Sequence, residues 1–232
     1  MTGTPSENES GDSASAPDSA FRALAGAWME DQAGILLSFV WQAYASMRHD
    51  APFVDGRDLE RSITQLLEPR IRATMSGDEP FYIQHGPFER ETMAPQPAQP
   101  PQYDLAFVLI SNERLMWPLE AKVMETPSSV AAYERDVRDQ YLQCRYAPFS
   151  DSGAMLGYLL SGSATDALTS IEAKLGCKLS AFPLLASKPH RISDHSRTVP
   201  KGKPYPLKFR CHHLIFDFSG LQRVRESAEN TA

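Results

Sequence analysis

The segment Glu120-Ala121-Lys122 places a carboxylate and an amine two residues apart within an apolar stretch. Successive side chains of a strand point to opposite faces, so in a strand Glu120 and Lys122 share one face and Ala121 faces the other layer. Asp104 lies sixteen residues before Glu120, at the start of another apolar run, where a hairpin would bring the two together. Neighbouring carboxylates repel each other unless a cation lies between them, and hard oxygen ligands suit Mg²⁺ or Mn²⁺.

Asp104 followed by Glu120-Ala121-Lys122 resembles the signature of the PD-(D/E)XK nuclease superfamily, which has a restriction-endonuclease-like fold. Tyr103 stands where the family name has its proline. The resemblance implies that Asp104, Glu120 and the main-chain carbonyl of Ala121 hold Mg²⁺ or Mn²⁺. It also implies that Lys122 orients or deprotonates the attacking water.

The same resemblance implies further site residues on two helices. The first helix of the family often supplies an acidic residue, and Glu60 matches that position; the alternative is a solvated helix carboxylate. Gln140, in the helix after the motif, matches a position that supports the site or contacts substrate, and Tyr133 is a weaker candidate for that role. For both, an ordinary structural place in the helix is the alternative.

Residues 188–210 carry seven Lys or Arg side chains against one Asp, although the whole chain has a net charge of −6. A solvated loop is one interpretation of this segment, and contact with a polyanion is the other. The predicted nucleic-acid contacts are Arg191, His195, Arg197, Lys201 and Lys203. His212 and His213 are adjacent in a predicted strand, so we expect them to face opposite sides as structural histidines rather than to share a zinc site.

Apolar periodicity and turn residues predict the elements that position these side chains. The predicted helices are 20–49 with a break at Gly26 or Gly34, 58–71 with Pro69 kinking or ending it, 129–146, and 165–175 ending at Gly176. The predicted strands are 81–88, 105–110, 115–123, 155–160, 179–185 and 209–218, and a basic loop joins the last two. This order predicts an α/β fold with a mixed central β-sheet flanked by helices. The nuclease resemblance, which covers residues 55–186, implies a restriction-endonuclease-like core.

Composition indicates a soluble globular protein, because 42% of the 232 residues are hydrophobic and 22% are charged. Residues 1–18 are acidic and rich in Ser, Gly and Pro, which predicts a disordered tail before a single nuclease-like domain at 19–232 with an N-terminal helical extension. The cysteines Cys144, Cys177 and Cys211 form no CxxC, which favours a reducing cytoplasm over a disulfide framework. The pattern predicts neither a membrane helix nor a signal peptide.

These observations favour a Mg²⁺-dependent endodeoxyribonuclease that hydrolyses phosphodiester bonds. The family habit adds DNA as the partner, a role in prokaryotic restriction or antiviral defence, and a homodimer or a partner subunit of such a system. The alternative is a catalytically silent nuclease-like module that binds nucleic acid or a partner protein. An unrelated α/β enzyme is a third interpretation, but the chain lacks GxGxxG, GxxxxGK[ST] and GxSxG.

The hairpin that joins the two motif strands decides whether the carboxylates meet. Directly opposed residues of an antiparallel pair point to the same face. A two-residue loop at Asn112 and Glu113 pairs residue 104 with 121 and turns the acids apart, whereas an odd loop centred on Asn112 pairs 104 with 120. A bulge near Pro118 would also restore the shared face. The chemistry therefore predicts an odd-residue loop or a bulge.

Overall fold

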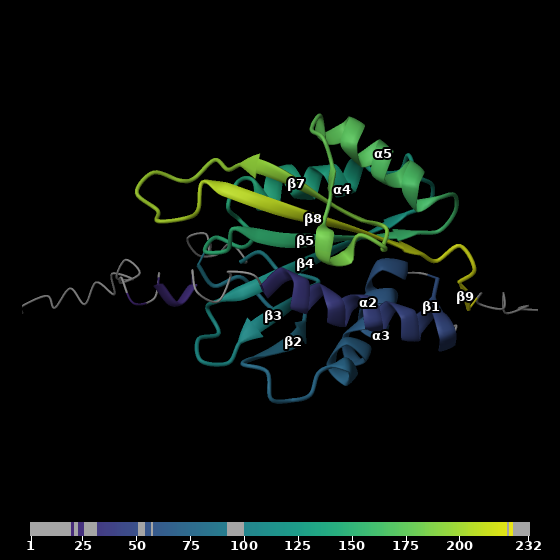
Figure 1. Cartoon of the computed structure of the whole chain (residues 1–232), viewed down its shortest axis with the longest axis horizontal. Helices are drawn as coiled ribbons and strands as arrows, with labels where there is room; N and C mark the ends of the chain where they lie inside the picture. The colour runs from purple at the N-terminus through teal and green to yellow at the C-terminus, as the bar shows by residue number, and fades with distance from the viewer. Residues whose placement is uncertain are drawn as a thin grey trace, which may run out of the picture.

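The computed structural model describes residues 20, 23–25, 32–50, 54–56, 58–91, 100–221 and 223–224, and the predicted disordered tail lies outside them. The helical elements are α2 (Gln32–Asp50), α3 (Leu59–Thr74), α4 (Ala131–Asp136), the π-helical segment η1 (Val137–Tyr141), α5 (Ala164–Leu175) and the 3₁₀ turn η2 (Pro183–Leu185). The strands are β1 (Val54–Asp55), β2 (Phe81–His85), β3 (Leu105–Leu109), β4 (Met116–Met124), β5 (Ser152–Leu159), β6 (Ser180–Ala181), β7 (His190–Ser196), β8 (Lys208–Asp217) and β9 (Arg223–Val224) (Figure 1).

One mixed sheet of seven strands organises the described residues, in the order β2-β3-β4-β5-β8-β7-β6. The central strands β4, β5 and β8 are parallel, and the remaining pairs of this sheet are antiparallel. Strands β1 and β9 form a separate parallel pair. The predicted α/β fold with a mixed sheet is confirmed, and the restriction-endonuclease-like core stays a prediction.

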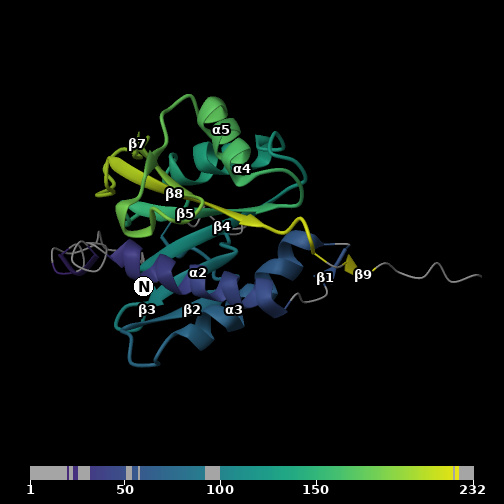
Figure 2. The ribbon, with the colours of Figure 1, turned by 45° about the vertical axis from the view of Figure 1, so that its right-hand side comes forward.

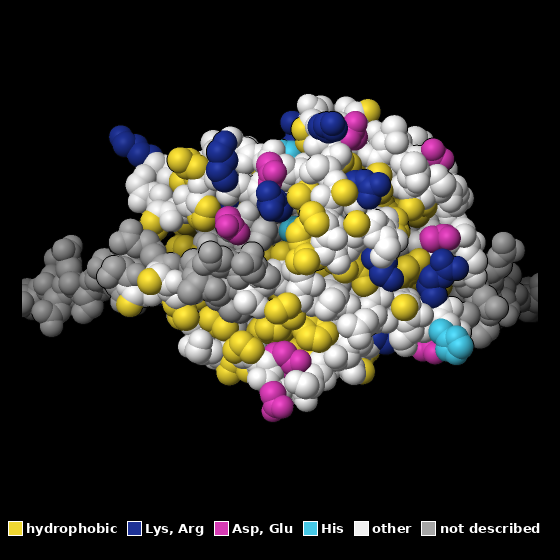
Figure 3. Space-filling view, in the orientation of Figure 1, with side chains coloured by type: hydrophobic (Ala, Val, Ile, Leu, Met, Phe, Trp, Pro, Cys, Tyr) yellow, Lys and Arg dark blue, Asp and Glu magenta, His cyan; other side chains and the backbone are white. Residues whose placement is uncertain are grey.

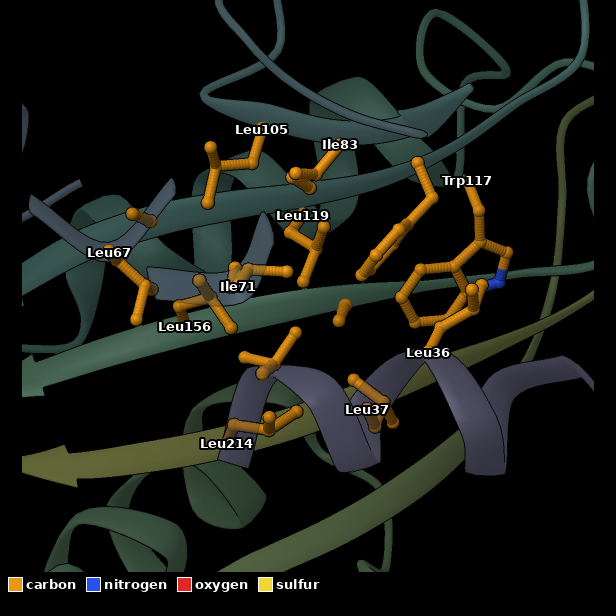
Figure 4. Packing of buried hydrophobic residues seen from close by; sticks show 14 of the residues in the cluster. Leu36, Leu37, Leu67, Ile71, Ile83, Leu105, Trp117, Leu119, Leu156 and Leu214 are labelled. Atoms are coloured by element: carbon orange, nitrogen blue, oxygen red, sulfur yellow. The ribbon is translucent and has the colours of Figure 1, made fainter. Parts of the chain in front are cut away.

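Helices cover both faces of the sheet, α2 and α3 on one side and α4 and α5 on the other (Figure 2). Leu36 and Leu37 of α2 pack towards Trp117 and Leu119 of β4 in the first layer (Figure 4). Met116 and Met124 of the same strand belong to the second layer. The alternation of β4 therefore directs Glu120 to the face covered by α4 and α5.

Local signals predicted two helix ends correctly, whereas neither Pro69 nor Gly34 ends its helix. The Asp58 side chain caps α3 by accepting a bond from the Arg61 N–H (3.2 Å), and Gly176 ends α5 in the left-handed conformation (φ 67°). However, α3 passes through Pro69 and ends only at Thr74. Similarly, α2 runs through Gly34, which packs so closely on Leu184 that a Cβ there would lie 2.5 Å from its Cδ1. Gly26 lies outside the described residues.

The segment after α5 differs most from the prediction. Strand β7 lies within the predicted basic loop, and Ile192 and Ser193 are buried there while β7 pairs with β8 along its whole length. The predicted strand at 179–185 is reduced to β6 and a 3₁₀ turn. The predicted helix at 129–146 ends at Tyr141, with its second half in the π-helical form.

The β3–β4 hairpin has the predicted odd register. Leu105 pairs with Leu119 and Val108 with Met116, and the Leu109 N–H donates to the Leu115 carbonyl (3.0 Å). The loop is therefore 110–114, centred on Asn112, and the same register places residue 104 opposite residue 120. Pro118 is tolerated because pairing between β4 and β5 begins only at Leu119.

No helix in the described ranges is both long enough and apolar enough to cross a bilayer. All three cysteines have free thiols, and two of them are buried. The proposed single domain at 19–232 stays a prediction.

The histidines of β7 and β8 form two buried contacts on opposite faces of the sheet, as the sequence predicted for His212 and His213. His190 Nε2 and His212 Nδ1 lie 3.1 Å apart, and both rings are shielded from solvent. His213 bonds the Ser193 hydroxyl (2.7 Å) and the Tyr133 hydroxyl (3.0 Å) in the other layer. Burial lowers the pKa of His190 to about 4 and that of His213 to about 3, and it also depresses the pKa of His212. Nearby Arg191 and Arg210 act in the same direction on His190 and His212.

We predict that the fold loses stability as the pH falls from about 6.5 towards 4, because its buried histidines resist protonation. These histidines stay neutral when folded but bind protons when unfolded below pH ~6.5, so stability is full above that pH and falls towards pH ~4. Each buried histidine contributes a slope of about 1.4 kcal/mol per pH unit. Urea unfolding followed by tryptophan fluorescence at several pH values measures it. His212→Gln should reduce the slope, whereas substitution of the exposed His49 should not; equal stability at pH 7 and pH 5 would contradict the prediction.

Candidate active site

The site forms at the part of β4 that extends beyond its pairing with β3. Pairing between these strands is described as far as Leu119, whereas β4 continues to Met124 beside β5. Alternate N–H groups on the other edge then point to the place that a further strand would occupy. Carboxylates accept these bonds instead, because the Ala121 N–H donates to Asp104 Oδ2 (2.7 Å) and the Val123 N–H donates to Glu60 Oε2 (3.2 Å). The strand edge thus brings together an acid from the residue just before β3 and an acid from α3.

The ammonium of Lys122 lies at the centre of these acids. Its Nζ lies 2.6 Å from the Ala121 carbonyl and 3.0 Å from Glu120 Oε1. The same Nζ lies 3.1 Å from Glu60 Oε1 and 3.1 Å from Asp136 Oδ2, and Asp104 Oδ2 is 4.0 Å away. Four carboxylates therefore surround one ammonium, and they come from β4, α3, α4 and the residue just before β3.

The charges of this cluster shift each other's pKa. Burial alone would lower the pKa of Lys122, but the surrounding carboxylates outweigh it and raise that pKa. Burial and the neighbouring Asp104 raise the pKa of Glu120 to about 8, against the opposing effect of Lys122. Burial likewise raises the pKa of Asp104. Lys122 is therefore a firmly protonated cation here, which suits orienting an anionic or polar group better than removing a proton.

The oxygen atoms at this edge fit a hard cation. Glu120 Oε2 is buried and has no hydrogen-bond partner among the described residues, so it is an acceptor that lacks a positive group. Asp104, Glu120 and the Ala121 carbonyl offer only oxygen, which Mg²⁺ and Mn²⁺ prefer. No set of three or more His, Cys, Asp or Glu side chains in the described ranges is arranged as a ready metal site.

Five predicted residues meet at this edge, and one participant was missed. Asp104, Glu120, Ala121, Lys122 and Glu60 come together as described. Asp136 escaped sequence analysis, although it lies four residues before Gln140 and thus near the same side of the helix. Gln140 Oε1 is buried without a described partner, and its role in the site stays a prediction. Tyr133 instead bonds His213 in the core.

The structure gives Arg197 a different role from the predicted phosphate contact. Its guanidinium is buried, with 6% of the residue exposed, and it donates to four main-chain carbonyls. The acceptors belong to Tyr141, Tyr146, Ala147 and Ser150, at distances of 2.6–3.0 Å. Arg197 therefore closes the turn between η1 and β5.

That turn supports the start of β3. Ala147 has a positive φ of 48°, and its N–H donates to the Tyr103 hydroxyl (3.0 Å). The Tyr146 hydroxyl donates to the Gln102 carbonyl (2.6 Å), two residues before Asp104. Arg197 therefore helps to hold the segment that delivers Asp104.

The other predicted nucleic-acid contacts differ in their accessibility. Arg191 donates to the His190 carbonyl (2.7 Å), and His195 bonds the Ser193 hydroxyl (2.6 Å) while half-buried. Lys201 and Lys203 are exposed. They lie on the loop between β7 and β8, which protrudes and carries Lys or Arg at its surface (Figures 1 and 3).

This loop lies at the other end of the sheet from the acids. Glu120 aligns with His213 through Met155, so Leu207, which ends the loop, precedes the level of the site by six residues. At 3.3 Å per residue that is about 20 Å along the strands, or roughly six base pairs of a duplex.

The chain matches no protein-family model, no curated protein and no solved structure.

We predict that Arg197→Met destabilises the fold by about 3–5 kcal/mol, because four buried carbonyls lose a charged donor. Urea denaturation measures the change. Lys203→Met, on the exposed loop, should stay within about 0.5 kcal/mol of the parent protein. A stable Arg197→Met protein with weakened nucleic-acid binding would instead return Arg197 to the predicted phosphate contact.

Proposed function

We propose that this protein is a metal-dependent nuclease that hydrolyses phosphodiester bonds of DNA. The observation that carries the proposal is the strand edge at which Asp104 Oδ2 accepts the Ala121 N–H, next to Glu120, the Ala121 carbonyl and the Lys122 ammonium. Carboxylates with no role at a site would remain in solvent, because burying like charges side by side is costly unless a cation compensates them.

Each residue has a role that follows from its atoms. Asp104, Glu120 and the Ala121 carbonyl would hold Mg²⁺ or Mn²⁺, which supplies a Lewis acid and a more acidic bound water. Lys122, protonated and with three donors, would orient the attacking water and attract the scissile phosphate. Glu60 fixes the strand edge through Val123 and holds the ammonium. Gln140 would contact the site or the substrate.

The remaining parts of the proposal concern biological setting. The resemblance to restriction-endonuclease-like enzymes supports a role in prokaryotic restriction or antiviral defence, with a second copy or a partner subunit. Three free thiols support a reducing cytoplasm. The competing function is a silent nuclease-like module that binds nucleic acid without cutting it.

We predict that the purified protein cleaves plasmid DNA with Mg²⁺ or Mn²⁺ and that a chelator stops the reaction. Glu120→Gln and Asp104→Asn should lower the cleavage rate by about 100-fold or more, because each removes a charged metal ligand. Both should fold, since losing a negative charge relieves repulsion. Glu113→Gln, in the exposed hairpin loop, is the matched control and should cleave normally. Cleavage that survives Glu120→Gln would refute the mechanism, and tight DNA binding without cleavage would favour the silent module.

We also predict that the β7–β8 loop contacts the phosphate backbone. Replacing both Lys201 and Lys203 by Ala should weaken binding to all sequences alike and flatten the dependence of log K on log salt by about 1–2, because fewer counterions are released. Fluorescence anisotropy at several salt concentrations measures the slope. The control pair Lys174 and Lys178, exposed near the end of α5, should leave it unchanged. An equal effect from both pairs would contradict the prediction, because it would mean that any exposed lysine pair contributes as much to binding as the loop does.

A further inference from the structure

The four oxygen atoms closest to Lys122 Nζ form two pairs by origin, and Asp104 Oδ2 lies further away at 4.0 Å. Two atoms close to Nζ, Glu120 Oε1 and the Ala121 carbonyl, belong to β4 itself and lie 3.0 Å and 2.6 Å away. The proposed function assigns the Glu120 carboxylate and the Ala121 carbonyl to the metal. Two others, Glu60 Oε1 and Asp136 Oδ2, come from helices on opposite faces of the sheet and each lie 3.1 Å away. The ammonium thus occupies the metal's oxygens while already bonded to a second pair of acids.

We propose that Lys122 is an exchangeable counter-ion, which leaves Glu120 and the Ala121 carbonyl when a divalent cation takes them and stays on Glu60 and Asp136. Asp136 is then a positioning residue that acts through Lys122. The inference rests on the proposed function, since it requires that the site bind a divalent cation.

The charges make the exchange necessary. When Glu120 gives up its proton to a bound cation, all four carboxylates are ionised and one ammonium leaves three negative charges uncompensated, so the site favours a further cation. An ammonium and a divalent ion cannot share the same two oxygens, because their repulsion rises as they approach. Asp104 and Glu120 together balance a divalent ion, and Glu60 and Asp136 then carry one negative charge more than Lys122 neutralises, which holds the ammonium between them.

The geometry requires only a small movement of the Lys122 side chain for the exchange. Lys122 has a flexible four-carbon stem and three donors, and its bonds to Glu60 and Asp136 are already formed. Glu60 is held in place by the Val123 N–H through its other oxygen. Asp136 lies on α4, over the face that Glu120 and Lys122 share. Only the two β4 contacts need to break, and the ammonium remains beside the place where water would attack.

A double-mutant cycle of Mn²⁺ affinity without DNA tests the inference. Isothermal titration calorimetry compares the wild type, Asp136→Asn, Lys122→Met and the double variant. Lys122→Met should bind Mn²⁺ more tightly than the wild type, since the competing ammonium is gone. Asp136→Asn should weaken Mn²⁺ binding about tenfold when Lys122 is present, because the ammonium then stays on the metal's oxygens. In the Lys122→Met background the same substitution should weaken binding by about twofold or less, so the two losses should differ by at least about fivefold. Asp139→Asn, an exposed acid three residues further along, is the matched control and should bind normally.

Each outcome decides between the alternatives. If Asp136→Asn lowers the Mn²⁺ affinity as much in the Lys122→Met background as in the wild type, Asp136 is a direct metal ligand and the exchange is overturned. Weaker Mn²⁺ binding by Lys122→Met than by the wild type would also overturn the exchange. If Lys122→Met does not fold, Lys122→Gln, which keeps a donor for the Ala121 carbonyl, replaces it in the same cycle. Coupled Mn²⁺ binding without DNA cleavage supports the exchange and refutes the nuclease. Cleavage without coupling overturns the exchange alone, and absence of Mn²⁺ binding overturns both.

Discussion

Beyond Leu119, one edge of β4 must satisfy its backbone groups without a neighbouring strand in the described part of the chain. In a buried sheet, an unpaired N–H costs about as much as a lost hydrogen bond, so the edge requires acceptors. Asp104, just before β3, and Glu60 of α3 supply them. An arrangement that solves a backbone problem therefore concentrates negative charge at one point, and the Ala121 carbonyl opens towards the same point.

The excess of carboxylates over basic groups at this edge explains the pKa shifts and contacts of Glu120 and Lys122. Glu120 is buried beside Asp104, which raises its pKa, and its second oxygen has no partner among the residues described. Lys122 is held by more carboxylates than it can neutralise. A site of this kind is stable with one ammonium but poised for an additional cation, which is the electrostatic basis of both the proposed chemistry and the proposed exchange.

The edge depends on a support that comes from the far end of the chain. Arg197 joins the turn after η1 to the strand hairpin β7–β8, and that turn bonds the residues just before Asp104. A guanidinium suits this role because its planar fork presents five donors to several carbonyls at once. The basic segment thus divides into one buried structural arginine and lysines that remain exposed on the β7–β8 loop.

Local rules were sufficient wherever the deciding interaction is short in sequence. The alternation of β4 determined that Glu120 and Lys122 share a face, the loop centred on Asn112 determined that Asp104 lies opposite Glu120, and Asp58 determined where α3 begins. Only tertiary structure decided that Asp136 reaches Lys122, that Arg197 is buried, and that β7 forms inside the basic segment. Arg197 bonds carbonyls 47 to 56 residues away, and periodicity carries no information about which distant segments pack together. Those contacts are set by the packing of helices and strands on a common sheet, where burial outweighs the local preference of a charged, proline-rich segment for solvent.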